Sequence, residues 1–278
     1  MSKVWFVTGA GSGLGAGIAR AALKAGDRVV ATGRNVDKVR SAFRDLETEN
    51  VGFIQLDITD EAQAKTAVDE AVNRFGRIDV LVNNAGYSLL GNFEEMTTAD
   101  IEQQITTNLF GAMYVMRAAL PVMRRQRSGH VINISSVAGV VGLKHCSAYA
   151  ASKFAIEGLS LSVAAEVEPF GIKMTVVEPG FFRTDLLDAK NVRYSANTID
   201  DYAADGSTEA TWSAYDGTQQ GDPAKLGDAL VTIAAMASPP KLFVAGTDAL
   251  AVITPVVEAR LQEMRTHEAL SKSTDGAF

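Results

Sequence analysis

Residues 3–15 read Lys-Val-Trp-Phe-Val-Thr-Gly-Ala-Gly-Ser-Gly-Leu-Gly, and this stretch decides the fold. The apolar run Lys3–Val7 predicts a short strand, and Thr8–Gly15 is a glycine-rich turn. Apolar residues at helical spacing follow directly: Ile18, Ala19, Ala22 and Leu23. A strand, a glycine-rich turn and a helix in this order form the unit that binds the pyrophosphate of a dinucleotide.

The glycine turn has the spacing that such a unit requires. Gly11–Ala16 fits the general Rossmann pattern G-x-G-x-x-A, whereas a lone match of this kind is often an ordinary flexible turn. Glycine allows a close approach of the backbone to phosphates, and the following helix offers unpaired N–H groups. We therefore expect cofactor contacts from Gly9, Gly11, Ser12, Gly13, Leu14 and Gly15.

The second predicted strand ends with a residue that bears on the choice of cofactor. Arg28–Thr32 is followed by Gly33 at the position where an acid would bind the ribose hydroxyls of NAD. Arg34 comes next, and its guanidinium suits the 2′-phosphate of NADP. The alternative is a solvated loop arginine. The sequence thus predicts NADP, with NAD less favoured.

Apolar runs and helical patterns alternate along the whole chain. Strands are predicted near residues 3–8, 27–32, 51–56, 79–82, 129–134, 172–178 and 241–245. Right-handed crossovers between them require a parallel sheet with helices on both faces, which is the doubly wound α/β fold. We expect a single domain over residues 1–278, because one α/β domain can reach this length.

Candidate polar groups follow the ends of several predicted strands. Asn83–Gly86 follows the strand at 79–82, Ser136 follows the strand at 129–134, and Pro179–Gly180 closes the strand at 172–178. Ligands of open α/β sheets bind at this carboxyl edge, so we expect the site there.

Residues 149–153 read Tyr-Ala-Ala-Ser-Lys. A Tyr and a Lys four apart on a helix lie on the same face. A neighbouring ammonium favours the phenolate and lowers the pKa of a Tyr toward the working pH. Tyr149 could then exchange a proton with a ketone or alcohol oxygen. Such a pair alone is often a solvated face, but here it accompanies the other motifs.

Together these motifs resemble the short-chain dehydrogenase/reductase family. The matches fall in the family's order over about residues 3–190, with Tyr149 thirteen positions after Ser136. They are Thr8-Gly9-x-x-x-Gly13-x-Gly15, Asn83-Asn84-Ala85-Gly86, Asn108, Ser136, Tyr149-x-x-x-Lys153, and Pro179-Gly180 with Thr184. The resemblance implies a seven-stranded sheet of order 3-2-1-4-5-6-7. NADP-preferring members often carry a basic residue inside the glycine turn, where this chain has Ser12.

The resemblance also implies roles for single residues. Ser136 would bind the substrate oxygen, Tyr149 would transfer the proton, Lys153 would hold the ribose, and Asn108 would hold a water linked to Lys153. The remaining cofactor contacts implied are Asp57 and Ile58 near the adenine, Asn84, Ala85 and Gly86, and Pro179, Gly180 and Thr184 near the nicotinamide. Asp57 could instead cap the helix at 60–75, a position that Asp60 fills more naturally.

Composition excludes several other classes of function. The chain has 33 acidic and 26 basic residues and no basic block, so we expect neither a nucleic acid nor a membrane partner. Cys146 is the single cysteine, and a lone free cysteine is more often inert than catalytic. The three histidines lack the spacing of metal ligands, so we expect no metal. Without a signal peptide or a long apolar run, a cytoplasmic location is expected.

Two regions depart from plain family members. Residues 181–221 contain six aromatic residues beside the expected site, which suggests a substrate lid, although a surface insertion is the alternative. An amphipathic helix over Ala249–Met264 is similar to the extended ends of steroid- and retinol-type relatives, which leaves a homo-oligomer possible. Residues 271–278 are expected to be a flexible tail.

The resulting hypothesis is an NADP(H)-dependent oxidoreductase that interconverts a bulky, apolar ketone and its secondary alcohol. The expected apolar wall consists of Leu89, Leu90, Val140, Val141, Leu143, Phe181 and Phe182. Arg183 is the counter-argument, because it could bind an acidic substrate unless it points to solvent or pairs with Asp185 or Asp188. The alternatives are an NAD-dependent epimerase or dehydratase and a cofactor-sensing regulator. The physiological substrate does not follow from the sequence.

Overall fold

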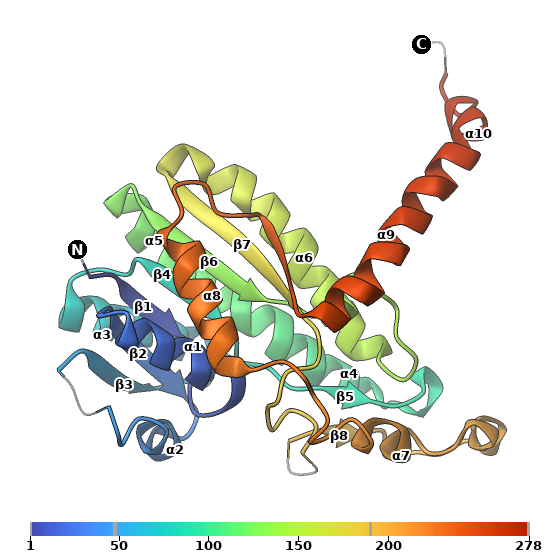
Figure 1. The fold of residues 1–278 in the computed structure, drawn as a ribbon, viewed down its shortest axis with the longest axis horizontal. Helices are drawn as coiled ribbons and strands as arrows, with labels where there is room; N and C mark the ends of the chain where they lie inside the picture. The colour runs from blue at the N-terminus through green and yellow to red at the C-terminus, as the bar shows by residue number, and fades with distance from the viewer. Residues whose placement is uncertain (1, 47–48, 189–190, 277–278) are drawn as a thin grey trace.

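The computed structural model describes residues 2–46, 49–188 and 191–276 (Figure 1). A sheet of seven parallel strands runs through its centre in the order β3-β2-β1-β4-β6-β7-β9. The strands are β1 (Val4–Val7), β2 (Arg28–Gly33), β3 (Val51–Gln55), β4 (Val80–Asn83), β6 (Gly129–Ile134), β7 (Ile172–Pro179) and β9 (Leu242–Ala245). Both the seven strands and their order were predicted.

Helices cover both faces of this sheet (Figure 1). On one face lie α1 (Gly13–Lys24), α2 (Val36–Ser41) and α8 (Pro223–Ala235). On the other lie α3 (Glu61–Phe75), α5 (Gly111–Gln126) and α6 (Ser147–Val167). Successive residues of β1 enter opposite cores, because side chains alternate along a strand: Trp5 and Val7 pack toward α1, and Phe6 toward α3. The doubly wound architecture is confirmed.

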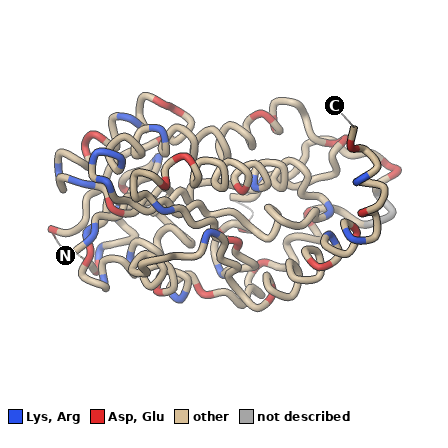
Figure 2. Tube along the Cα trace, turned by 90° about the horizontal axis from the view of Figure 1, so that it is seen from above, with Lys and Arg blue, Asp and Glu red and all other residues tan. Residues whose placement is uncertain are grey.

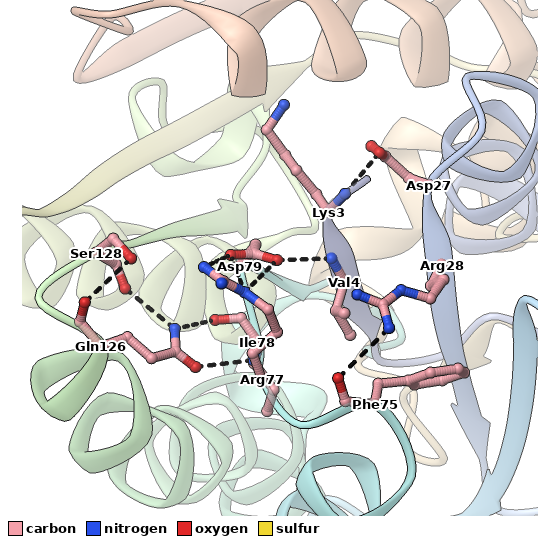
Figure 3. Close-up of polar contacts among 10 residues, drawn as sticks. All are labelled: Lys3, Val4, Asp27, Arg28, Phe75, Arg77, Ile78, Asp79, Gln126 and Ser128. Carbon is pink, nitrogen blue, oxygen red and sulfur yellow. Dashed lines mark hydrogen bonds and ion pairs between the residues drawn. The ribbon is translucent and has the colours of Figure 1, made fainter. Parts of the chain in front are cut away.

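The amino end of the sheet is fastened by carboxylates (Figure 3). Asp79 accepts a hydrogen bond of 2.8 Å from the backbone N–H of Val4, and Arg77 pairs with the same carboxylate at 2.6 Å. Asp27 accepts from the N–H of Lys3 at 2.8 Å. These contacts fix the starts of β1, β2 and β4, and they leave the opposite, carboxyl edge of the sheet for a ligand.

A smaller element at the carboxyl edge was not predicted. Strand β5 (Leu89–Leu90) pairs in parallel with β8 (Arg193–Tyr194), and this two-stranded sheet ties the segment 181–221 to the body. Other short elements of this side are α4 (Thr98–Ile105), the π-helical turn η2 (Thr106–Phe110), and the 3-10 helices η1 (Phe93–Glu95), η3 (Val137–Gly139) and η5 (Asp200–Asp205). A further 3-10 helix, η4 (Glu168–Phe170), directly precedes β7 at the amino edge. Helix α7 (Thr208–Ser213) follows η5.

The C-terminal helix α9 (Thr247–Thr266) extends away from the body (Figure 1). It covers the predicted helix at 249–264, and its outer part leaves Val257, Leu261 and Met264 at 53%, 46% and 64% exposure. Helix α10 (Glu268–Lys272) follows. The predicted flexible tail therefore begins inside a helix, and residues 277–278 lie outside the described part of the chain.

Charged residues of both signs are mixed along the trace (Figure 2). No helix within the described ranges is both long and apolar enough to cross a membrane.

Candidate active site

A cavity of about 600 Å³ opens at the carboxyl edge of the main sheet. It is lined by almost all of the predicted site residues. These are Gly9, Gly11, Ser12, Gly13, Leu14, Arg34, Asp57, Ile58, Asn84, Ala85, Gly86, Ser136, Tyr149, Lys153, Pro179, Gly180 and Thr184. Two predicted residues, Gly15 and Asn108, are not part of this lining.

The glycine turn closes against the end of β4. Gly9 and Gly13 have φ angles of 66° and 55°, which favour glycine. A Cβ atom on Gly15 would lie 2.3 Å from the carbonyl oxygen of Gly9 and 2.5 Å from Nδ2 of Asn84. Thr8 Oγ1 in turn accepts hydrogen bonds of 2.9 and 3.0 Å from the N–H groups of Asn84 and Ala85. The absence of a side chain at Gly15 thus allows the turn to pack closely against Asn84.

We expect Gly15→Ala to destabilise the turn, because the methyl group overlaps backbone atoms. The cost should be about 1–3 kcal/mol of folding free energy, as for other overpacked sites. Thermal unfolding with and without NADP measures it. Gly158→Ala in α6 is the matched control, because its Cβ meets nothing within 4 Å. Equal stabilities of the two variants would contradict this account of the turn.

Two cations border the part of the cavity next to β2. Arg34 is exposed and, in the described part of the chain, forms neither an ion pair nor a hydrogen bond through its side chain. Lys38 lines the same cavity one helical turn later, on α2, whose N-terminus is capped by Asn35 through a 2.9 Å hydrogen bond. The sequence reasoning missed Lys38, although its spacing from Arg34 could have indicated it. Both ammonium and guanidinium suit a phosphate.

Asp57 and Ile58 line the cavity after β3. Asp57 accepts hydrogen bonds from the N–H and the hydroxyl of Thr59 at 3.0 and 2.8 Å. Helix α3 is capped by Asp60 instead, which accepts from the N–H groups of Ala62 and Gln63. The capping role considered for Asp57 is therefore filled by Asp60.

Three of the four predicted catalytic side chains meet in the cavity. Tyr149 and Lys153 come from the first turns of α6, and Ser136 precedes η3 at the end of β6. Lys153 Nζ lies 5.5 Å from the centre of the Tyr149 ring and donates a 2.8 Å hydrogen bond to the carbonyl of Ile134. This bond fixes the ammonium beneath the phenol.

The pKa of Tyr149 differs from the expectation. Burial raises the pKa of Tyr149 to about 12, against an opposing effect of hydrogen bonds from the hydroxyls of Ser136 and Ser88. Burial also lowers the pKa of Lys153 to about 8. Burial disfavours the charged phenolate and is the largest cause of the shift, so Tyr149 keeps its phenol proton at neutral pH. That is the form that can donate a proton to a ketone oxygen. Ser88, a second hydroxyl at the phenol, was not singled out from the sequence.

Asn108 lies behind the cavity wall, in the π-helical turn η2. It is 4% exposed. Its Nδ2 donates to the carbonyl of Tyr87 at 3.0 Å and to the hydroxyl of Ser152 at 3.3 Å, and its Oδ1 accepts from the N–H of Tyr87 at 3.1 Å. The side chain therefore holds the wall next to Lys153.

The expected apolar wall is present only in part. Leu90, Leu143, Phe181 and Phe182 line the cavity. Val140 and Val141 instead pack with Ile253 of α9, and Leu89 packs with Met96 and Ala148. Leu89 and Leu90 are neighbours in β5, where consecutive side chains point to opposite sides.

Arg183 does not line the main cavity. It borders a neighbouring cavity of about 210 Å³ together with Asp185, Asp188 and Asp216, and its Nη2 donates to the carbonyl of Gln219 at 3.3 Å. A different arginine, Arg193 of β8, lines the main cavity.

Arg193 was missed because its position depends on the pairing of β5 with β8. It donates to Oε1 of Gln103 at 2.9 Å and lies over the ring of Tyr87 at 5.2 Å. Its partners are thus an amide and an aromatic ring.

Cys146 is buried in the cavity wall, and burial raises the pKa of its thiol to about 12. A thiol that stays protonated is a poor nucleophile. Among the described residues, no three His, Cys, Asp or Glu side chains gather as metal ligands would.

Comparison with known proteins bears on the family resemblance. The family model described as short chain dehydrogenase matches residues 3–194. An oxidoreductase of Botryotinia fuckeliana is 38% identical over 251 residues, which are 90% of this chain and 91% of that protein. A 3-ketodihydrosphingosine reductase of Bacteroides thetaiotaomicron is 35% identical over 241 residues, which are 86% of each protein.

Solved structures agree with the sequence relatives. The structure of a short-chain dehydrogenase from Streptomyces avermitilis is 37% identical, covers 99% of both chains and has a TM-score of 0.89. The structure of ElxO with NADP bound is 29% identical, covers 90% of this chain and 100% of its own, and has a TM-score of 0.75. The chain belongs to the short-chain dehydrogenase/reductase family and is one of its oxidoreductases.

Proposed function

We propose that the protein reduces a bulky ketone with NADPH and oxidises the corresponding secondary alcohol with NADP. One observation carries this proposal: the proton-transfer pair Tyr149 and Lys153 lines the same cavity as the glycine turn and the cations Arg34 and Lys38. A nicotinamide dinucleotide with a 2′-phosphate suits this order of groups. The NADP in the structure of ElxO supports it.

The residues fit the parts of such a cofactor. The glycine turn and the N-terminus of α1 suit the pyrophosphate, because the helix offers free N–H groups there. Arg34 and Lys38 suit the 2′-phosphate, and Asp57 and Ile58 suit the adenosine. Pro179, Gly180 and Thr184 suit the nicotinamide side. The bound cofactor supplies or accepts the hydride.

The protein's own residues then orient the carbonyl and move the proton. Ser136 donates a hydrogen bond to the substrate oxygen, and Tyr149 gives that oxygen its proton. Lys153 holds the ribose hydroxyls, and its positive charge stabilises the phenolate that Tyr149 becomes. Asn108 acts as a positioning residue, since its side chain binds both the backbone of Tyr87 and the hydroxyl of Ser152, the neighbour of Lys153 in α6.

The substrate part of the cavity favours a large and mostly apolar molecule. Leu90, Leu143, Phe181 and Phe182 gain from burying apolar substrate surface at ~25 cal/mol per Å². The segment 181–221 contributes Phe181, Phe182 and Trp212 among others to the cavity lining and acts as a lid, within one domain over 1–278. A relative named as a reductase of a 3-keto compound supports the choice of a ketone.

A substrate panel tests the proposal. We expect higher kcat/KM with NADPH for aryl ketones and for steroid or retinoid carbonyls than for sugars or keto acids. Spectrophotometric initial rates measure it. A preference for keto acids that Arg193→Ala abolishes and Arg183→Ala leaves intact would contradict the apolar substrate class. Absence of NADPH turnover with every carbonyl would contradict the reaction itself.

A further inference from the structure

Two buried polar atoms of the lid, residues 181–221, have no hydrogen-bond partner in the described part of the chain. They are Nε1 of Trp212 and Oε1 of Gln219. Both residues line the main cavity, and Gln219, which is only 4% exposed, also borders the neighbouring cavity of Arg183. Buried polar groups are nearly always hydrogen-bonded, so a pair of unpaired ones on a cavity wall points to a ligand.

Both groups are held in place by their surroundings. The amide of Gln219 donates through Nε2 to Asp216 at 3.3 Å, and its backbone carbonyl accepts from Arg183 at 3.3 Å. Its Oε1 is thereby left over as an acceptor. The Trp212 ring packs against the stacked rings of Phe181 and Tyr215, with centroid distances of 6.3 Å and 5.9 Å.

Trp212 packs against an apolar cluster. Leu90, Leu143, Cys146, Phe181 and Leu187 form one cluster with it. The indole N–H is a donor only, and Gln219 Oε1 is an acceptor only. A carboxylate would be repelled by the amide oxygen, and an ammonium would leave the indole N–H unpaired. A hydroxyl group serves both, because it donates one hydrogen bond and accepts others.

We propose that Trp212 and Gln219 bind a hydroxyl group of the substrate. Trp212 Nε1 donates to the hydroxyl oxygen, and Gln219 Oε1 accepts its proton. The substrate class is then a bulky apolar ketone that carries a hydroxyl in addition to the reacting carbonyl. This assignment rests on the proposed function, since Ser136 and Tyr149 hold the carbonyl.

Kinetics with a series of related ketones test the proposal. The probes are 4-phenylbutan-2-one and its three derivatives with a hydroxyl at ring position 2, 3 or 4. Each hydroxy derivative is also tested as its methyl ether. The hydroxyl is not conjugated with the carbonyl, so it changes binding and not intrinsic reactivity. We expect at least one hydroxy isomer to exceed the parent ketone about tenfold in kcat/KM, with the gain mainly in KM, because its hydroxyl satisfies both buried groups.

The lid variants should remove this preference. In Trp212→Phe and Gln219→Leu, the ratio of kcat/KM between the best hydroxy ketone and the parent should fall toward one, and methylation of the hydroxyl should have the same effect in the wild type. Tyr215→Phe is the control, because it removes a hydroxyl from the same aromatic group and should keep the ratio. A ratio that persists in both lid variants, or no hydroxy isomer better than the parent, would overturn the proposal.

Calorimetry separates this proposal from the proposed function. The NADPH-loaded Tyr149→Phe enzyme should bind the best hydroxy ketone more tightly than the parent, although it does not turn over. If the wild type reduces no ketone but this binding preference exists and depends on Gln219, the reaction fails and the hydroxyl site stands. If ketones are reduced without any hydroxyl preference in rate or binding, the site fails and the reaction stands.

Discussion

Tyr149→Phe lowers kcat for ketone reduction at least ~100-fold, the range expected when a general acid is removed. The variant keeps the ring in its place on α6 but has no proton to give. In the structure the pKa of this phenol is raised to about 12 by burial, so the wild type holds the proton at neutral pH. Initial rates with NADPH measure the effect.

The binding of the cofactor serves as an internal control for this variant. The glycine turn, Arg34 and Lys153 are unchanged, so the Kd for NADPH should remain within about threefold of the wild type, the effect of one weak contact. Tyr114→Phe on α5 removes a hydroxyl outside the cavity and should leave kcat unchanged. Near-normal turnover by Tyr149→Phe would refute the role of this residue as the acid.

Arg34→Asp reverses the preference for the cofactor. The carboxylate repels the 2′-phosphate of NADPH and can accept hydrogen bonds from the ribose hydroxyls of NADH. We expect kcat/KM for NADPH to fall about 100-fold, the scale of losing a charge-assisted contact and adding a like charge. Values of kcat/KM for both cofactors in the wild type and the variant measure it.

Two further variants sharpen this test. Lys38→Ala should weaken NADPH binding by a smaller factor, because it removes one exposed cation without adding the like charge that Arg34→Asp introduces. Arg44→Asp makes the same change of net charge outside the cavity and should keep the wild-type preference. A wild type that favours NADH, or equal effects of Arg34→Asp and Arg44→Asp, would show that Arg34 does not contact the cofactor.

The main sheet was predictable because its strands are buried on both faces. Such strands appear as continuous apolar runs, as at Val80–Val82, and the glycine spacing at Gly9–Gly15 fixes the first crossover. Once the order of the strands is known, Ser136 and Pro179–Gly180 can be placed together at the carboxyl edge without knowledge of any contact.

The outer wall of the cavity was less predictable, because it depends on contacts across the lid. The pairing of β5 with β8 puts Arg193, and not Arg183, into the main cavity. Two paired residues carry no periodic signal. The pKa of Tyr149 also could not follow from its spacing to Lys153, because burial decides it.

The transfer of deuterium from cofactor to substrate tests the central claim most directly. The enzyme is given NADPH dideuterated at C4 of the nicotinamide with the best ketone of the panel, and the product is analysed by mass spectrometry and NMR. The proposed reaction yields the secondary alcohol with a single deuterium on the carbinol carbon. Recovery of unchanged ketone, or of a product without deuterium at that carbon, would contradict it.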